Sequence, residues 1–279
     1  MNRLRLYFLL AVLSAILVLI GRYFGGSQGA VLFFLLALGM NFFTYYYSDR
    51  IAMAMTRSRP LSRAEAPEIY RIIERLSRQA GLPVPAVYLT PSPQPNAFAT
   101  GRNPQHAAIA VTEGLFNLLD EAEIEGVIAH ELAHVKNRDT LVGTISASLA
   151  GAITMIASVL RWGLIFGTNR DDEEGGNPIA ALVMVILAPL AAVLIQMAIS
   201  RAGEFSADAT GARIAGRADG LASALMKLEQ ASRRIPMDVN PAASHLFIVN
   251  PLSAESLARL FSTHPPTSER VKRLRQMVF

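Results

Sequence analysis

Apolar residues along this chain are gathered into four long blocks, which polar and charged stretches separate. The first block follows a basic start at the N-terminus, and the others run from Ala30 to Tyr47, from Thr140 to Phe166 and from Pro178 to Ser200. An α-helix rises about 1.5 Å per residue, so that about 20 apolar residues cross the roughly 30 Å of hydrocarbon in a bilayer. The pattern therefore predicts four transmembrane helices, the first two joined by a glycine-rich turn.

Two of these assignments have alternatives. A basic start and one apolar run are also typical of a secretory signal peptide, but Gly21, Arg22 and Tyr23 form a poor cleavage site, and a second apolar run follows at once. The last two blocks could instead pack as a hydrophobic hairpin within or against the membrane face. Spanning is favoured because the acidic tip between them, residues 171–174, needs water and neither helix has a polar face.

The chain between the second and third blocks is polar, and its periodicity changes along its length. Apolar side chains recur on one helical face from Glu65 to Gln79, and Gly81 is a stop signal for this helix. Ala86 to Thr90 and Ala107 to Thr112 are short runs of β type. The stretch between these two strands predicts a loop or an irregular edge.

A second helix in this segment begins at Asp120, and Glu123 three residues later completes a capping box. Its pattern continues through His130 and His134 into the third apolar block. One continuous helix is therefore predicted, and it would hold this segment close to the membrane surface.

These elements predict a mainly α fold of four transmembrane helices and an α+β domain with a small sheet. Residues 1–47 would form two transmembrane helices, and residues 140–200 a transmembrane hairpin. Residues 48–139 and 201–279 would supply the two segments of the domain.

The basic residues orient these spans. Cytoplasmic flanks carry an excess of Lys and Arg. Two arginines precede the first block and four follow the second, whereas the turn between the blocks has one (Arg3, Arg5; Arg50, Arg57, Arg59, Arg63; Arg22). Both termini and both domain segments are therefore expected in the cytoplasm. These arginines also account for the net charge of +4, so no nucleic-acid partner is predicted.

The strongest chemical signal is the run from His130 to His134, which reads HELAH. The chain has no cysteine, so histidines and carboxylates must hold any metal ion. Two imidazoles four residues apart share one helical face and can reach one ion. Glu131 is offset by about 100° and can serve as general base for the attacking water. A chance match is the alternative, but the chain has only five histidines. We expect zinc, which these ligand types suit.

A catalytic zinc ion has three protein ligands and one open position. The extended motif with a third histidine is absent, because Thr140 occupies that position. Glu204 and Asp208 lie four residues apart in the second domain segment. We expect Glu204 to be the third ligand and Asp208 to orient a ligand histidine. The alternative is a solvated pair with Arg201 and Arg213.

The ordered set of motifs resembles the HtpX family of bacterial membrane zinc metalloproteases, which are related to the CAAX prenyl proteases. HELAH on a helix, EFSADA around Glu204, and STHPPTSER near the C-terminus carry a resemblance that covers essentially the whole chain. It implies a zincin-like domain of gluzincin type and a multi-pass protein of the bacterial inner membrane whose site faces the cytoplasm. The implied substrates are damaged or misassembled membrane proteins, degraded under stress.

The resemblance also implies a place for the substrate. Residues 96–101, which read NAFATG, would form an edge along which the substrate backbone lies. Asn96 and Ala97 would bind that backbone as in β-augmentation.

Four further positions have one or more interpretations. His264 could donate a hydrogen bond to the oxyanion of the reaction, or it could only precede a helix from Pro266 to Met277. Arg270 could pair with Asp208 or Glu204. The two histidines without a partner pattern are expected at the surface or in loops (His106, His245).

We therefore expect a membrane-bound zinc endopeptidase that cleaves misfolded or damaged membrane proteins, with protein substrates and the lipid bilayer as partners. A CAAX-type processing protease is one alternative, since it shares the chemistry but cuts prenylated C-termini. A non-catalytic membrane scaffold is the other, and replacement of Glu131 would leave its phenotypes intact.

Overall fold

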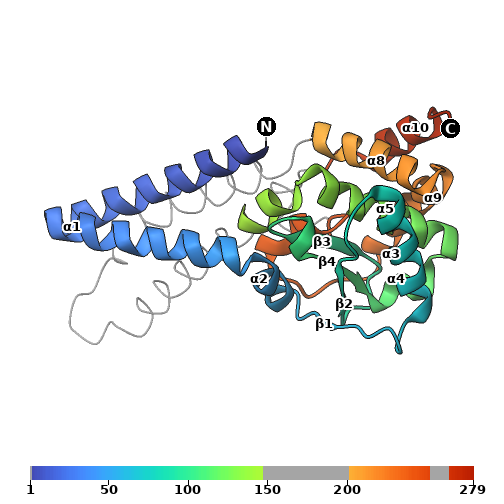
Figure 1. The fold of residues 1–279 in the computed structure, drawn as a ribbon, viewed down its shortest axis with the longest axis horizontal. Helices are drawn as coiled ribbons and strands as arrows, with labels where there is room; N and C mark the ends of the chain where they lie inside the picture. Colours follow the sequence, from blue (N-terminus) through green and yellow to red (C-terminus); the bar gives the residue numbers. More distant parts are fainter. Residues whose placement is uncertain (1, 147–200, 252–263) are drawn as a thin grey trace, which may run out of the picture.

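A long helical hairpin forms the N-terminal part of the molecule (Figure 1). The structure, a computed structural model, describes residues 2–146, 201–251 and 264–279. Helix α1 spans Asn2–Tyr46 and reverses direction at Gly25 and Gly26, where Gly26 adopts a positive φ of 59°. Asn41 Nδ2 donates a hydrogen bond to Ser14 Oγ across the two arms, at 3.0 Å. The predicted pair of helices with a glycine turn is thus present.

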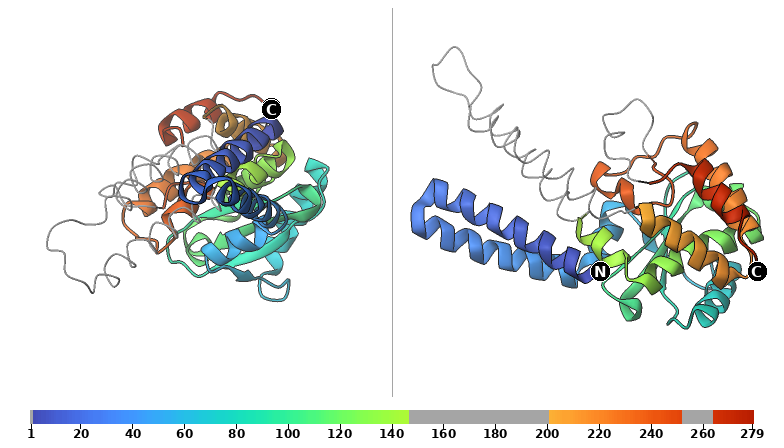
Figure 2. Two further views of the ribbon diagram at one scale, coloured as in Figure 1. Left: turned by 90° about the vertical axis from the view of Figure 1, so that its left-hand side faces the viewer. Right: turned by 90° about the horizontal axis from the view of Figure 1, so that it is seen from above.

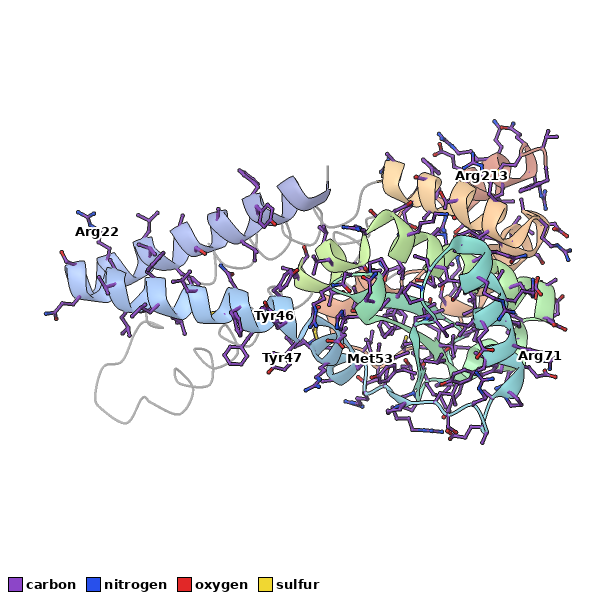
Figure 3. The ribbon with its side chains drawn as sticks, viewed as in Figure 1. Arg22, Tyr46, Tyr47, Met53, Arg71 and Arg213 are labelled. Carbon is purple, nitrogen blue, oxygen red and sulfur yellow. The ribbon has the colours of Figure 1, made fainter. Side chains whose placement is uncertain are left out.

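The second arm of this hairpin exposes large apolar side chains, among them Leu32 at 63% and Phe43 at 61%. Within the described residues, Gly25–Tyr46 is the one helix long and apolar enough to cross a membrane. Tyr46 and Tyr47 lie at the base of the hairpin beside the domain (Figure 3). The predicted third and fourth spans lie mostly in residues 147–200, outside the described part of the chain, so four spans remain a prediction.

A four-stranded mixed sheet lies inside the domain, in the order β1-β2-β4-β3. β1 (Arg59–Pro60) is antiparallel to β2 (Ala86–Thr90), β2 is parallel to β4 (Ala107–Thr112), and β4 is antiparallel to β3 (Ala97–Gly101). The two predicted strands match β2 and β4. The pattern did not predict β3 as a regular strand because it follows a proline-rich run, residues 91–95, and ends at Gly101, which are loop signals.

Helices surround this sheet (Figure 2). Along the chain they are α2 (Ser48–Met55), α3 (Pro67–Ala80), η1 (Pro104–His106), α4 (Glu113–Leu118), α5 (Glu121–Asn137), α8 (Arg201–Ala215), α9 (Asp219–Ser232), η2 (Pro241–Leu246) and α10 (Thr267–Arg275). The predicted capping box at the start of α5 is confirmed, and α9 was not predicted. A mainly helical fold with a small mixed sheet is therefore confirmed.

Both faces of the sheet are buried. One face packs with α3, α5, α8 and α9 in the main core. The other face packs with α2 and with Phe247, whose ring centroid lies 4.9 Å from that of Phe98 in β3. β3 is an edge strand, so the backbone groups on its outer side are open to partners from elsewhere.

Helix α5 crosses its two neighbours in the core at glycines. A Cβ atom on Gly211 of α8 would lie 2.9 Å from the Cα of His130. A Cβ atom on Gly126 of α5 would lie 2.4 Å from the backbone nitrogen of Leu221 in α9. Because both separations are shorter than ordinary contacts, only glycine allows the helices to approach this closely. Backbone contact therefore fixes the position of α8 against His130.

The prediction that α5 continues into the next apolar block is wrong. α5 ends at Asn137, Arg138 has a left-handed φ of 60°, and residues 140–146 form a separate helical segment. In a continuous helix, a residue five positions after His134 would be rotated about 140° away from it. The break instead turns Asp139 back toward His134, and its backbone nitrogen donates to the His134 carbonyl at 3.0 Å.

Candidate metal centre

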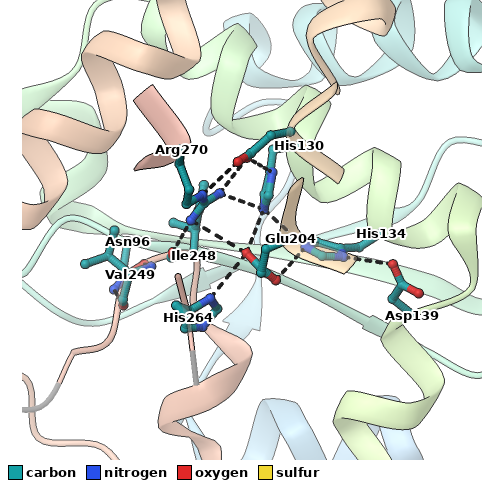
Figure 4. Close-up of polar contacts among 10 residues, drawn as sticks. Asn96, His130, His134, Asp139, Glu204, Ile248, Val249, His264 and Arg270 are labelled. Carbon is teal, nitrogen blue, oxygen red and sulfur yellow. Dashed lines mark hydrogen bonds and ion pairs between the residues drawn. The ribbon is translucent and has the colours of Figure 1, made fainter. Parts of the chain in front are cut away.

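Two histidines of α5 and one glutamate of α8 converge at a buried point (Figure 4). The Nε2 atoms of His130 and His134 are 3.1 Å apart. Glu204 Oε1 lies 3.5 Å from Nε2 of His134, and Glu204 Oε2 lies 3.8 Å from Nε2 of His130. Ligand atoms about 2.0–2.1 Å from a tetrahedral zinc ion are roughly 3.3 Å apart. The donor atoms and their spacing therefore fit one small divalent cation.

The Glu204 carboxylate supports this fit. The residue is 4% exposed, and its Oε2 lies 3.2 Å from Nδ1 of His264 and 3.6 Å from Nη1 of Arg270. A buried carboxylate is unfavourable unless nearby groups compensate its charge, and a cation bound between it and the two histidines would do so. The alternative interpretation of the sequence, in which Glu204 is a solvated ion-pair residue, is wrong because its side chain is buried against the histidines of α5.

Carboxylates behind the two histidines determine which ring nitrogen faces the centre. His130 Nδ1 lies 3.0 Å from Asp208 Oδ1, and His134 Nδ1 lies 3.3 Å from Asp139 Oδ2. An imidazole that donates its Nδ1–H to a carboxylate keeps the Nε2 lone pair available to a metal ion. Sequence reasoning missed Asp139, since only the break after α5 brings it to His134. The sequence feature that could have indicated this role is an aspartate five residues after His134, in a polar stretch.

Arg270 is a buried cation between the ligands and the sheet edge. Its Nε and Nη2 donate to the two carboxylate oxygens of Asp208, at 2.9 and 2.7 Å. Its Nη1 donates to the backbone carbonyl of Ile248, at 3.1 Å. Burial disfavours the Asp208 anion, but Arg270 holds the pKa of Asp208 at about 2. The two buried charges therefore compensate each other.

Glu131 lies beside the ligands and is 2% exposed. Burial raises the pKa of its carboxyl to about 7, although the charge of His134 opposes this shift. A carboxyl that titrates near neutral pH can accept a proton from water and return it to a leaving group. Glu131 is thus suited to general acid–base chemistry.

The metal-free ligands differ in their affinity for protons. Burial lowers the pKa of His130 to about 4. Burial also opposes the charged form of His134, but Asp139 and Glu204 raise the pKa of His134 to about 9. Despite burial, His264 and His134 hold the pKa of Glu204 well below its ordinary value. An incoming cation would meet an ionised carboxylate and replace the proton on His134.

His264 lies on the other side of Glu204. Its Nδ1 is 3.2 Å from Glu204 Oε2, and its side chain is 12% exposed. Its Nε2 has no hydrogen-bond partner among the described residues. Of the two sequence interpretations, this position favours a place in the site over a simple helix-entry residue.

The edge strand predicted to bind substrate lies next to this cluster. Thr112 N donates to the carbonyl of Asn96 at 3.0 Å, which fixes the hydrogen-bond alternation with β4. In an antiparallel ladder, alternate residues then turn their backbone groups outward. Ala97 and Ala99 are the outward-facing residues nearest the site.

Part of this edge is already paired within the chain. Ile248 N donates to the carbonyl of Ala97 at 3.0 Å. Asn96 Nδ2 donates to the carbonyl of Val249 at 2.8 Å, and Val249 N lies 3.4 Å from Asn96 Oδ1. The two residues expected to bind substrate therefore bind residues 248–249 in this structure.

The remaining histidines lie outside the cluster. His106 is exposed, with Nδ1 2.9 Å from Asn103 Oδ1, as expected. His245 is 5% exposed, and its Nε2 lies 3.1 Å from the carbonyl of Gly143. The expectation that His245 lies at the surface is wrong, because η2 packs against residues 140–146.

Known proteins resemble the chain along its length. Residues 63–278 match the family described as Peptidase family M48. The Protease HtpX homolog of Pelotomaculum thermopropionicum is 65% identical over 279 residues, 99% of either chain. Protease HtpX of Legionella pneumophila is 53% identical over 279 residues, also 99% of either chain.

The fold is similar to that of a solved structure. The crystal structure of Ste24p from S. mikatae superimposes with a TM-score of 0.53 at 19% sequence identity. The alignment covers 98% of this chain and 64% of that one. Together with the buried His–His–Glu cluster and the apolar hairpin, these matches show that the chain belongs to peptidase family M48 and is a membrane-bound metallopeptidase.

Proposed function

We propose that the chain is a zinc-dependent endopeptidase in which His130, His134 and Glu204 hold the ion. The observation that carries this proposal is the convergence of three ligand atoms, all within 4.8 Å of one another, beside a carboxyl with a pKa of about 7. Two imidazoles, one carboxylate and an open fourth position are typical of catalytic zinc.

The chain's own residues divide the work of peptide hydrolysis. Zinc would supply Lewis acidity, which polarises the scissile carbonyl and makes water more acidic. Glu131 takes a proton from the attacking water and later gives it to the leaving amine. His264, in its imidazolium form with Nδ1 directed at Glu204, donates from Nε2 to the carbonyl oxygen as that oxygen gains negative charge. Asp208 and Asp139 keep both imidazoles in the tautomer that binds the ion.

Substrate binding would use the outer side of β3. The Ala97 carbonyl and the Asn96 carboxamide can bind an extended peptide as an added strand. Backbone recognition of this kind tolerates many sequences. It suits an enzyme that removes misfolded or damaged membrane proteins under stress.

The proposed arrangement in the bacterial inner membrane is multi-pass. Residues 1–47 and 140–200 would lie in the bilayer, and residues 48–139 and 201–279 would form the catalytic domain in the cytoplasm. Arginine stacking at the base of the hairpin supports this orientation. Arg50 lies 5.5 Å from the ring centroid of Tyr47, and Arg102 lies 5.4 Å from that of Tyr46.

The catalytic proposal is tested on the full chain, purified in detergent and loaded with zinc. Glu131→Gln should keep one zinc per chain and lose casein cleavage, whereas Glu204→Ala should lose both. Glu269→Ala is the matched control, because this carboxylate is 45% exposed and pairs only with Arg273 among the described residues. Normal zinc content and turnover in Glu204→Ala would remove Glu204 from the ligand set.

Substrate class is tested by direct comparison in one bilayer. The enzyme is reconstituted with a misfolded membrane protein, and cleavage is compared with that of unfolded casein and of a prenylated peptide. Cleavage within the membrane protein is expected to be fastest. Selective release of the prenylated C-terminal residues would instead indicate a CAAX-type processing protease.

Orientation is testable because the chain has no cysteine. Gln28→Cys places a thiol at the exposed tip of the hairpin, and Glu121→Cys places one on the exposed start of α5. A membrane-impermeant maleimide should label the Gln28→Cys protein in intact spheroplasts and should label the Glu121→Cys protein only after lysis. The reverse result would place the catalytic domain outside the cytoplasm.

A further inference from the structure

All four backbone polar groups of Ile248 and Val249 contact residues of the site. The amide and carbonyl of Ile248 bind the Ala97 carbonyl at 3.0 Å and Arg270 Nη1 at 3.1 Å. The amide and carbonyl of Val249 contact Asn96 Oδ1 at 3.4 Å and Asn96 Nδ2 at 2.8 Å. One backbone–backbone hydrogen bond to β3 and three contacts with the Asn96 and Arg270 side chains therefore hold the segment at the sheet edge.

The segment runs antiparallel to β3, because Ile248 contacts Ala97 and Val249 contacts Asn96. Ile248 lies beside Arg270 and Glu204, whereas Val249 and Asn96 lie farther from the ligands (Figure 4). The segment therefore leads away from the metal centre along β3. Nη1 of Arg270 also lies 3.6 Å from Glu204 Oε2. The Arg270 guanidinium therefore lies between the Ile248 carbonyl and a proposed metal ligand.

Side chains on both faces of the sheet hold the segment in place. Phe247 is fully buried against Phe98 on one face. Ile248 and Val249, which are 2% and 9% exposed, join the main core on the other face. The chain thus wraps around the edge of β3 at the outward carbonyl of Ala97.

We propose that residues 247–249, here called the strap, are an internal pseudosubstrate that a protein substrate must displace before it can be cleaved. This inference rests on the proposed function, since it assigns the strap to the same edge. The groups that bind the strap are the Ala97 carbonyl, the Asn96 carboxamide and the Arg270 guanidinium. A substrate backbone would take over the same groups.

Replacement of the strap by a substrate favours substrates that lie in the same membrane as the enzyme and therefore have a high local concentration. A substrate replaces the strap's hydrogen bonds one for one, so backbone contacts alone give no net advantage. A tethered competitor has an effective concentration on the order of millimolar. Apparent substrate affinity falls in proportion to the fraction of enzyme with a free edge. Dilute soluble peptides would be poor substrates, while proteins held in the same bilayer could compete.

The strap also indicates which substrate side chain the edge accepts. Ile248 occupies the position beside Arg270 with a branched aliphatic side chain, buried in the main core. When the strap leaves, this space becomes available to the substrate. Peptides with an aliphatic residue at the corresponding position should therefore be preferred over peptides with a charged residue there.

The first test locks the strap to the edge. Ala97→Cys and Ile248→Cys are combined in the zinc-loaded full chain, where no other thiol can interfere. Peptide cleavage should fall at least about tenfold on oxidation, as the competent fraction falls, and should recover with dithiothreitol. The two single-cysteine variants receive the same treatment. Equal activity of the cross-linked and reduced enzyme, with the cross-link verified by mass spectrometry, would overturn the proposal.

The second test releases the strap without changing the groups that bind substrate. Phe247→Ser removes the contact with Phe98 on the far face of the sheet, and kcat/KM for a soluble peptide should rise at least about fivefold. Phe279→Ser is the matched control, because Phe279 is 59% exposed. A lower kcat/KM in folded Phe247→Ser enzyme, shown by its zinc content and unfolding temperature, would mean that the strap is a permanent wall of the site.

Hydrogen exchange separates this inference from the proposed function. In zinc-loaded Glu131→Gln enzyme, a saturating peptide should make the amides of Ile248 and Val249 exchange faster. Slower or unchanged exchange would show that the peptide binds without displacing the strap. If the wild-type enzyme cleaves the peptide and the Glu131→Gln enzyme does not, the peptidase function is supported. This conclusion does not depend on the result of the hydrogen-exchange experiment.

Discussion

The metal centre and the sheet edge lie side by side, but they bind through different parts of the chain. At the centre, side chains from α5 and α8 supply every proposed ligand atom, and carboxylates stand behind both imidazoles. At the edge, backbone groups of β3 bind residues 248–249 of the same chain. The first region is proposed to hold a metal ion. The second is proposed to bind a peptide segment that a substrate can replace.

Removal of a proposed ligand should have the largest effect, and it acts on the first region alone. His134→Ala should eliminate stoichiometric zinc and reduce casein cleavage below detection, because two ligands do not complete a catalytic site. Zinc is measured by mass spectrometry on the detergent-purified full chain. His106→Ala, at an exposed position, should retain both properties. Full zinc content in His134→Ala would contradict the ligand set.

Loss of the carboxylate behind His130 should affect stability more than any change at the edge. Asp208→Asn removes the carboxylate that binds the Arg270 guanidinium at two atoms, and leaves this 1% exposed cation with Glu204 Oε2 at 3.6 Å. Breaking a buried ion pair costs about 3–5 kcal/mol. Chemical denaturation of the zinc-free protein should show this decrease in unfolding free energy. Asp238→Asn, at a carboxylate that is 86% exposed, should change it by less than about 0.5 kcal/mol.

The carboxylate behind His134 should affect the metal more than the fold. Asp139 is 25% exposed, so Asp139→Asn leaves no deeply buried charge unpaired. Zinc affinity should weaken by about 10–100-fold, the usual cost of losing such a partner. Competition with a chelating dye measures the affinity. An unchanged affinity would mean that Asp139 is only a helix-terminus residue.

The smallest single effect should come from the edge, because Asn96 holds strap and substrate alike. Asn96→Ala should change kcat/KM for a soluble peptide by less than about threefold, since the loss applies to both competitors. In the Phe247→Ser background the strap no longer competes, and the same change should lower kcat/KM by about tenfold, the value of one good hydrogen bond. Equal effects in both backgrounds would show that Asn96 binds only one of the two peptides.

The metal centre and the sheet edge also differ in how far their residues could be predicted from the sequence. Helical spacing placed His130, Glu131 and His134, and the same reasoning selected Glu204, because side-chain chemistry is visible in residue identity. Asp139 was missed since its role depends on a chain reversal at Arg138, where no glycine or proline marks the end of α5. The strap was missed for a different reason. Backbone groups are the same in nearly every residue, so the residue types at 247–249 do not indicate that this segment binds the edge of β3.

The elements of the fold likewise divide into those that have a local sequence signal and those that do not. β2, β4 and the capped start of α5 have local signals and were predicted, whereas β3 follows a proline-rich run and ends at Gly101, which are loop signals. The contact of η2 with residues 140–146, which buries His245, depends on packing between distant segments. The predicted third and fourth membrane spans lie outside the described residues and stay a prediction.

The close contact of Gly211 with His130 has a consequence for variants of this enzyme. Replacing glycine by alanine inside a helix usually raises helix stability by about 1 kcal/mol. At this position the added methyl group would meet the His130 backbone at 2.9 Å and push α8 outward. Glu204 travels with α8, so the carboxylate would retreat from the imidazoles. A substitution about two helical turns along α8 from Glu204, and mild by helix propensity, would thereby produce an apparently inactive protease with its motif intact.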